Sequence, residues 1–135
     1  MNGRAFLDTN VLVYALGRRD DRTPTADALL AGGGVVSVQV LNELASVARR
    51  KLHMPWPKVV AALAEIQILC PAPVPTTVAI HDSALTLAAR LGYNFYDALI
   101  VAAALEAKCS ILYSEDLQDG QVIEDRLKIR NPFLV

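Results

Sequence analysis

Four acidic residues lie beside apolar segments of the sequence, at positions where an α/β protein commonly has its active site. Asp8 comes directly after a short apolar run, and Asp116 follows a second such run near the C-terminus. Asp97 opens a helix that is apolar nearly all round, and Glu43 lies one turn into the helix after another apolar run. In open α/β sheets, ligands bind at the carboxyl ends of the strands. We therefore expect the four carboxylates to meet at one edge of a sheet.

Like charges brought together in this way need a counter-ion. Two carboxylates about 4 Å apart repel by roughly 4 kcal/mol at an effective dielectric constant near 20. Four of them cannot all stay ionised unless a cation neutralises them. The set contains only oxygen donors, while His53 and His81 lie far from it in the sequence and are expected at the surface or at helix ends. An all-oxygen set favours Mg²⁺ or Mn²⁺ over zinc.

Each acid also has an ordinary structural interpretation. Asp8 could cap the helix that follows it, Glu43 could be a solvated residue on a polar helix edge, and Asp116 lies in a turn where aspartate is common. Asp97 is harder to explain locally, because only Arg90 among the basic residues lies within seven positions of it. The helix dipole favours a carboxylate there, but a buried one needs a partner or a metal.

The elements that would position these acids alternate between strands and helices. We expect strands at 5–7, 35–38, 111–114 and within 127–130, and helices at 11–15, 23–31, 39–52, 58–68, 76–91 and 96–108. Thr23 or Thr25 would cap the second helix, Gly92 would end the fifth, and the proline-rich stretch 70–75 allows only a short or edge strand. This alternation favours an α/β fold whose small, mostly parallel sheet is covered by helices on both faces.

Composition narrows the remaining possibilities. The 135 residues suit a single domain spanning 1–135, and 53% hydrophobic with 20% charged residues is typical of a compact protein. No apolar run approaches the roughly 18 residues of a membrane helix, and the N-terminus lacks a signal-peptide pattern, so we expect a cytoplasmic protein. Cys70 and Cys109 lie in apolar contexts and are expected to be reduced core thiols rather than a disulfide.

Taken together, the motifs resemble those of the PIN domain family, and most closely the VapC toxins of bacterial toxin–antitoxin pairs. The resemblance spans essentially the whole chain and rests on four segments in order: 6–14 (FLDTNVLVY), 42–43 (NE), 96–100 (YDALI) and 114–117 (SEDL). It implies a PIN-like three-layer α/β/α sandwich. It also implies an endoribonuclease that depends on Mg²⁺ or Mn²⁺, with an RNA substrate, a cognate antitoxin protein that blocks the site, and a homodimer.

The resemblance also assigns roles to individual positions. The implied acidic, metal-binding set is Asp8, Glu43, Asp97 and Asp116, with supporting positions at Thr9, Asn10 and Ser114 and a further candidate at Asp119. The expected chemistry is hydrolysis of a phosphodiester bond by a metal-activated water, which a carboxylate orients or deprotonates. The RNA 2′-hydroxyl is not needed as a nucleophile, so the products should carry 5′-phosphate and 3′-hydroxyl ends.

The net charge of −1 gives no global basic field of the kind typical of nucleic-acid-binding domains. Any charge that binds phosphate must therefore be local. Two basic clusters could contact the RNA backbone, although each could equally be an ordinary solvated surface. They are Arg18, Arg19 and Arg22 in one, and Arg49, Arg50 and Lys51 in the other.

Other protein classes also place acids at strand ends. Receiver domains and aspartyl-phosphate phosphatases need a second acid beside the first-strand aspartate or two residues after it, where this chain has Leu7 and Asn10. A dinucleotide-binding module needs glycines between strand and helix, whereas glycines 32–34 precede a predicted strand. The remaining alternative is a PIN-fold binding protein with little or no nuclease activity that acts through a protein partner.

Overall fold

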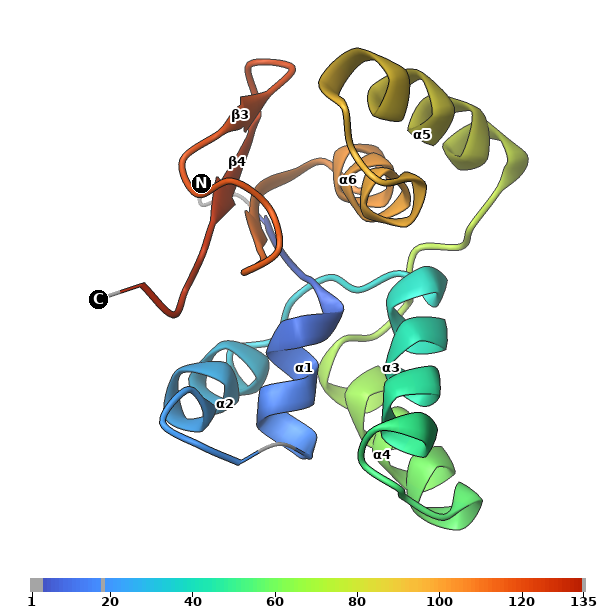
Figure 1. Cartoon of the computed structure of the whole chain (residues 1–135), viewed down its shortest axis with the longest axis vertical. Coiled ribbons are helices and arrows are strands. Elements are labelled where there is room, and N and C mark those ends of the chain that lie inside the picture. The colour runs from blue at the N-terminus through green and yellow to red at the C-terminus, as the bar shows by residue number, and fades with distance from the viewer. Residues whose placement is uncertain (1–3, 18, 135) are drawn as a thin grey trace.

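A small sheet and the helices around it make up the computed structural model, which describes residues 4–17 and 19–134 (Figure 1). The strands are β1 (Arg4–Leu7), β2 (Cys109–Tyr113), β3 (Val122–Ile123) and β4 (Leu127–Arg130). The helices are α1 (Thr9–Leu16), α2 (Thr23–Ala31), α3 (Val38–Arg50), α4 (Trp56–Leu69), α5 (Val78–Leu91) and α6 (Phe95–Glu106).

The register of the sheet brings three strand ends together. The strand order is β1-β2-β4-β3, in which β1, β2 and β4 run parallel and β3 is antiparallel to β4. Phe6, Leu112 and Ile129 pair across these three strands and are fully buried. The next row holds Leu7 and Tyr113, the last residues of β1 and β2. Residues that follow these strands therefore emerge side by side at one edge.

Helices cover the sheet from two sides. Figure 1 shows α1 to α4 as one group and α5 with α6 as another, and α6 packs against β2. Every residue of α6 from Ala98 through Leu105 is buried, which explains why this helix is apolar nearly all round. The predicted three-layer α/β/α arrangement with a mostly parallel sheet is confirmed.

The predicted strand 35–38 is wrong as a strand, although it lies in the expected place. Val35 forms an isolated parallel bridge with Phe6, and Ser37 forms another with Val74. Ser37 is also the N-cap of α3, where its hydroxyl accepts the Val40 N–H at 3.2 Å, so the chain turns into a helix before a strand can extend. The bridge at Val74 confirms that the proline-rich stretch forms only a short paired segment.

Two further details differ from expectation. The two-residue strand β3 was not predicted, because it is too short to show an alternating pattern. The predicted threonine caps of α2 are also wrong. The N-cap is Arg22, without a side-chain bond, because the Thr23 hydroxyl donates to the Tyr14 carbonyl and accepts the Asp20 N–H.

Several other sequence expectations for the fold agree with the structure. Gly92 ends α5 as predicted, and β4 occupies the segment where the last strand was expected. Cys70 and Cys109 are both buried and free. Of the helices within the described ranges, none combines the length and apolarity needed to cross a bilayer.

Two glycines that end helices make a matched test of backbone strain. Gly92 ends α5 in the left-handed region, with φ 74° and ψ 23°, while Gly32 ends α2 with φ −71° and ψ −8°. We expect Gly92→Ala to destabilise the fold by about 1 kcal/mol, since a Cβ is unfavourable there. Gly32→Ala should be neutral or slightly stabilising, because its Cβ would meet nothing closer than 3.6 Å. Thermal melts of both variants provide the measurement, and an equal loss in the two would show that the left-handed backbone at Gly92 does not require glycine.

Candidate functional site

Asp8, the residue directly after β1, is buried with only 3% of its surface exposed. Its Oδ1 accepts the Thr9 backbone N–H at 2.7 Å, so it does cap α1. Its Oδ2 accepts the hydroxyl of Ser114, which follows β2, also at 2.7 Å. Burial raises the pKa of Asp8 to about 7, against the lowering effect of the Ser114 and Thr9 bonds and with a further rise from Glu43 and Asp116. The hydrogen-bond donors that the structure gives this carboxylate are neutral, so its negative charge is hydrogen-bonded but not balanced by a cation.

Asn10 links Asp8 to Asp116. Its Nδ2 donates to Asp116 Oδ2 at 3.2 Å and lies 3.5 Å from both Asp8 Oδ2 and Ser114 Oγ. The Ser114 hydroxyl oxygen also accepts the Asp116 backbone N–H at 3.1 Å. The two strand-end acids therefore share a small set of neutral donors from α1 and from the turn after β2.

Glu43 projects from α3 toward the same place. Its Oε2 accepts the Thr9 hydroxyl at 3.1 Å, and its Oε1 accepts Gln39 Nε2 at 3.2 Å. Thr9 is thereby bonded on one side to the cap of α1 and on the other to an acid of α3. Gln39 was not among the predicted site residues, although its position four residues before Glu43 on one helix face is the signal that could have identified it.

Asp97 lies in the first turn of α6 and completes the group. Burial raises its pKa, and the charges of Asp116 and Glu43 raise it further. Asp8 is affected by Glu43 and Asp116 in the same way. Asp8 and Asp97, which lie on separate elements, therefore both lie within electrostatic reach of Glu43 and Asp116.

The donor chemistry of this group fits a hard divalent cation. Among the residues that the structure describes, no three Asp, Glu, His or Cys side chains stand close enough to hold a metal ion as they are. The acids offer only carboxylate oxygens, and Asp8 is buried among neutral donors. Burial, with smaller contributions from the charges of Glu43 and Asp116, raises the pKa of both Asp8 and Asp97. An all-oxygen donor set suits Mg²⁺ or Mn²⁺ better than zinc. If the chain binds such an ion, the residues that would hold it are Asp8, Glu43, Asp97 and Asp116.

Glu43 lines two open hollows, with volumes of about 220 Å³ and about 530 Å³. The smaller is lined by Thr9, Asn10, Val13, Tyr14, Glu43, Val47, Lys51, Glu115 and Asp116, and the larger by Gln39, Asn42, Glu43, Ser46, Arg50, Asn94, Tyr96 and Asp97. Asp116 therefore lines one hollow and Asp97 the other, while Glu43 lines both. A chain-like ligand lying across Glu43 could contact both hollows.

Two of the six basic residues predicted to contact RNA line these hollows: Lys51 the smaller and Arg50 the larger. Arg18 lies outside the described residues. Each of the other three is engaged by a nearby side chain: Arg19 by Asp27 at 3.3 Å, Arg22 by Asp20 at 2.7 Å, and Arg49 by the Trp56 ring, 4.8 Å from its centroid. The cations best placed to meet a ligand near the acids are therefore on α3.

Comparison with known families places this geometry in context. The family model of the PIN domain matches residues 5–118, which include all four acids. The chain belongs to the PIN domain family.

Two solved structures share the fold of this PIN domain. One is VapC20 of Mycobacterium tuberculosis, described as a toxin that cleaves the sarcin–ricin loop. It has a TM-score of 0.67 and 24% identity over 82% of this chain and 88% of that chain. The other is VapBC2 of Rickettsia felis bound to a DNA fragment from its promoter, with a TM-score of 0.67 and 20% identity over 94% and 98% of the two chains. A search of curated proteins by sequence gave no significant match.

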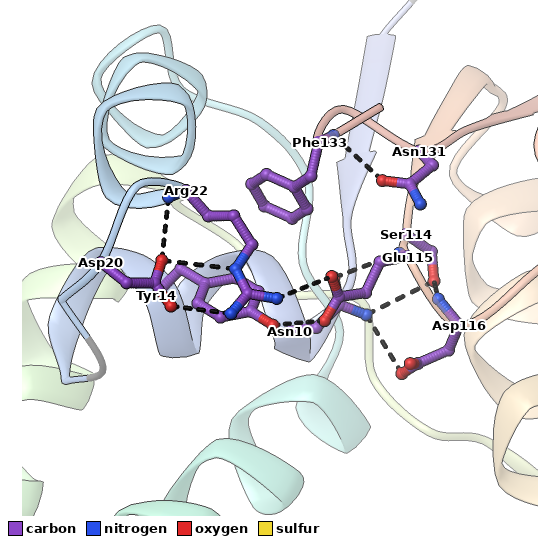
Figure 2. Close-up of polar contacts among 9 residues, drawn as sticks. All are labelled: Asn10, Tyr14, Asp20, Arg22, Ser114, Glu115, Asp116, Asn131 and Phe133. Atoms are coloured by element: carbon purple, nitrogen blue, oxygen red, sulfur yellow. Dashed lines mark hydrogen bonds and ion pairs between the residues drawn. The ribbon is translucent and has the colours of Figure 1, made fainter. Parts of the chain in front are cut away.

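A polar cluster beside the acids was not predicted from the sequence (Figure 2). The Tyr14 hydroxyl donates to Glu115 Oε1 at 2.6 Å, and the Arg22 guanidinium lies over the Tyr14 ring, 4.2 Å from its centroid. Burial, followed by the bond to Glu115, raises the pKa of Tyr14 to about 12, so this hydroxyl remains a donor at working pH. Tyr14 lies on the same apolar stripe of α1 as core residues, which is why its polar end carried no signal in the sequence.

Asp119, the further acidic candidate, is bonded elsewhere. Its Oδ1 accepts the Asn131 backbone N–H at 2.8 Å, which ties the turn after β2 to the segment that follows β4. Through this bond, Asp119 has a structural role in the turn after β2. Its role as a supporting residue of the acidic site stays a prediction.

The buried charge of Asp8 predicts how stability depends on pH. In the folded protein the pKa of Asp8 is raised from 3.8 to about 7. The free energy of unfolding of the metal-free protein should therefore fall as the pH rises from about 4 to about 7, and level off above pH 7. The shift corresponds to roughly 4 kcal/mol. Asp8→Asn keeps an oxygen to cap α1 and removes the charge. In EDTA we expect the variant to melt higher than the wild type at pH 8, with the gap shrinking toward pH 5.

Thermal melts from pH 5 to pH 8 provide the measurement. Asp82→Asn is the control, because Asp82 is exposed on α5 and its loss should leave the pH profile unchanged. A gap between Asp8→Asn and wild type that stays constant across this range would show that Asp8 does not titrate as a buried acid.

Proposed function

We propose that this PIN domain is a metal-dependent endoribonuclease that hydrolyses RNA phosphodiester bonds, and that it is the toxin of a toxin–antitoxin pair. The proposal is supported by the hydrogen bonds through Thr9, Asn10 and Ser114 that link the buried Asp8 to Glu43 and Asp116, and by Asp97, which lies within electrostatic reach of Glu43 and Asp116. Membership of the PIN domain family and the fold shared with VapC20 support the same reaction class.

In the proposed mechanism, the acids bind the metal ion and neighbouring polar residues hold the acids in position. The four carboxylates would hold Mg²⁺ or Mn²⁺, and a carboxylate not fully engaged by the ion would orient the attacking water or accept its proton. Thr9, Asn10 and Ser114 hold the acids in place through their hydrogen bonds. When bound, a divalent ion supplies Lewis acidity, which acidifies water and neutralises charge on phosphate oxygens.

The two hollows beside Glu43 provide a path for the RNA strand. A phosphate in the middle of the path would face the acids, while its neighbours would lie near Lys51 on one side and Arg50 on the other. Arg50 is exposed and its Nε donates to Ser46 Oγ at 3.0 Å, which leaves its terminal nitrogens available for phosphate.

A second candidate function rests on one observation. Because no three acidic, histidine or cysteine side chains of the described residues stand at metal-binding distances, the chain could instead be a PIN-fold binding protein that acts through a partner. The buried, unbalanced charge of Asp8 favours the nuclease, since a binding surface has no need of it.

The proposed partners are an antitoxin protein and a second copy of the chain, in the cytoplasm. The VapBC2 structure, whose fold this chain shares, is bound to promoter DNA. Helix α4 presents Trp56, Val60 and Ile68 along one face, with 58%, 65% and 77% of their surfaces exposed. An exposed apolar stripe of this kind supports a protein interface.

The first test is cleavage of RNA by the purified protein. We expect cleavage in Mg²⁺ or Mn²⁺, none in EDTA, and products with 5′-phosphate and 3′-hydroxyl ends, because water rather than the 2′-hydroxyl is the nucleophile. Mapping of the product ends on total RNA provides the measurement. Ends that carry 2′,3′-cyclic phosphate would contradict the mechanism.

The matched variants for this test are Asp97→Asn and Asp82→Asn. The first removes an acid of the site and should abolish cleavage while the protein stays folded. The second removes an exposed aspartate of α5 and should cleave like the wild type. Full activity of Asp97→Asn in Mg²⁺ would remove Asp97 from the proposed set.

The RNA path predicts a salt effect. If Arg50 contacts one phosphate, Arg50→Gln should flatten the slope of log affinity against log salt by about 0.7, the value for one contact with single-stranded nucleic acid. Binding of RNA to the protein in EDTA gives the slope without cleavage. Arg4→Gln is the control, because Arg4 begins β1 at the opposite edge of the sheet and donates to the Ala107 carbonyl. An unchanged slope in Arg50→Gln would exclude Arg50 from the path.

A further inference from the structure

Hydrogen bonds to the side chain and to the backbone of Glu115 connect Tyr14, by way of Asn10, to the acids (Figure 2). The Tyr14 hydroxyl donates to Glu115 Oε1 at 2.6 Å, and the Glu115 backbone N–H lies 3.4 Å from Asn10 Oδ1. Asn10 Nδ2 in turn donates to Asp116 Oδ2 at 3.2 Å. Each of these three hydrogen bonds joins a residue of α1 to a residue of the turn after β2. Together they hold α1 and this turn against each other.

The middle of this series of hydrogen bonds fixes which way the Asn10 amide faces. Its oxygen meets an N–H of Glu115, and its NH₂ group meets the carboxylates of Asp116 and Asp8. A flipped amide would aim its oxygen at two carboxylates and its NH₂ at a backbone donor, and both changes are repulsive. The correct orientation therefore depends on the Glu115 N–H staying where it is.

Two further contacts hold Glu115 and Tyr14 in place. Arg22 Nη1 lies 3.8 Å from Glu115 Oε2, while Asp20 holds the same guanidinium at 2.7 Å. The ring of Phe133 packs edge-on against Tyr14, with 5.1 Å between the centroids. Tyr14 itself is only 5% exposed. The hydroxyl is thus held by packing around its ring and has one short bond, which goes to Glu115.

We infer that Tyr14 is a positioning residue for the acidic site: through Glu115, its hydroxyl sets the orientation of the Asn10 amide and thereby holds Asp116 beside Asp8. Arg22 belongs to the same device, as the cation that keeps the Glu115 side chain against Tyr14. The inference rests on the proposed function for its consequence in catalysis, but the arrangement of Tyr14, Glu115 and Asn10 can be tested without RNA.

The decisive variant is Tyr14→Phe, which keeps the ring and removes only the hydroxyl. We expect the side-chain amide signals of Asn10 to shift in the ¹⁵N NMR spectrum of the metal-free protein, where Asn10→Ala identifies them by their loss. We also expect the dissociation constant for Mn²⁺, measured by EPR, to rise about three- to tenfold. Loss of a direct partner of a metal ligand costs roughly 10–100-fold, and Tyr14 acts one bond further out.

Two Glu115 variants show whether the effect passes through Glu115. Glu115→Gln keeps an oxygen for the Tyr14 hydroxyl and should leave the Asn10 signals near their wild-type positions. In a Glu115→Ala background, Tyr14→Phe should add no further change, because the acceptor has already gone. Additive effects of the two substitutions on Mn²⁺ binding would overturn the inference.

Tyr93→Phe is the matched control. The Tyr93 hydroxyl also donates to a side-chain oxygen at 2.6 Å, that of Gln121, so the substitution removes an equivalent bond that does not lead to Asn10. Its Asn10 signals should stay in place. Unchanged Asn10 signals in Tyr14→Phe would overturn the inference, whether or not the protein cleaves RNA. A wild type that neither binds Mn²⁺ nor cleaves RNA would instead refute the proposed function, and the metal-free NMR comparison would still decide the role of Tyr14.

Discussion

The buried carboxylate of Asp8 is the feature on which the arrangement of the site depends. Asp8 is almost completely removed from solvent, yet the groups bonded to it are a backbone N–H, a hydroxyl and, more weakly, an amide. Burial of a carboxylate costs several kcal/mol unless a cation accompanies it. Serine or asparagine at this position could cap α1 equally well without that cost. The capping role therefore explains the backbone bond of Asp8 but not its charge.

The fold places only neutral donors around that charge, and it does so by strand register. β1 and β2 end in the same row, so the residue after one and the residue after the other, Asp8 and Ser114, come within hydrogen-bond distance. α1 begins at this point and contributes Thr9 and Asn10 from its first turn. A lysine or arginine in any of these places would balance the charge permanently. Among the described residues, no lysine or arginine is hydrogen-bonded to Asp8, so its charge has no fixed counter-ion there.

The sequence predicted the parts of the site that depend on strand ends and on long helices. Asp8 and Asp97 could be singled out because a polar residue beside a long apolar segment is conspicuous. The contacts among side chains could not be predicted, since they depend on which helix faces meet. Gln39 reaches Glu43, and Tyr14 reaches Glu115 more than a hundred residues away, through packing that no local pattern encodes. The 35–38 segment was misjudged for a related reason: Ser37 can pair as a strand residue or cap a helix, and tertiary context decided for the cap.

The distribution of basic side chains bears on how an acidic site could accept a polyanion. Arg22, which the sequence analysis placed among the possible phosphate contacts, forms ion pairs with Asp20 and Glu115. Its positive charge is therefore largely balanced by these two carboxylates. Arg50 and Lys51 follow Glu43 on α3 by seven and eight residues, which is about 10–12 Å along the helix axis. At that distance cations attract the neighbouring phosphates without balancing the acids themselves. If the substrate is RNA, as we propose, this separation would let Arg50 and Lys51 attract the strand without neutralising the acids at which the proposed metal ion would bind.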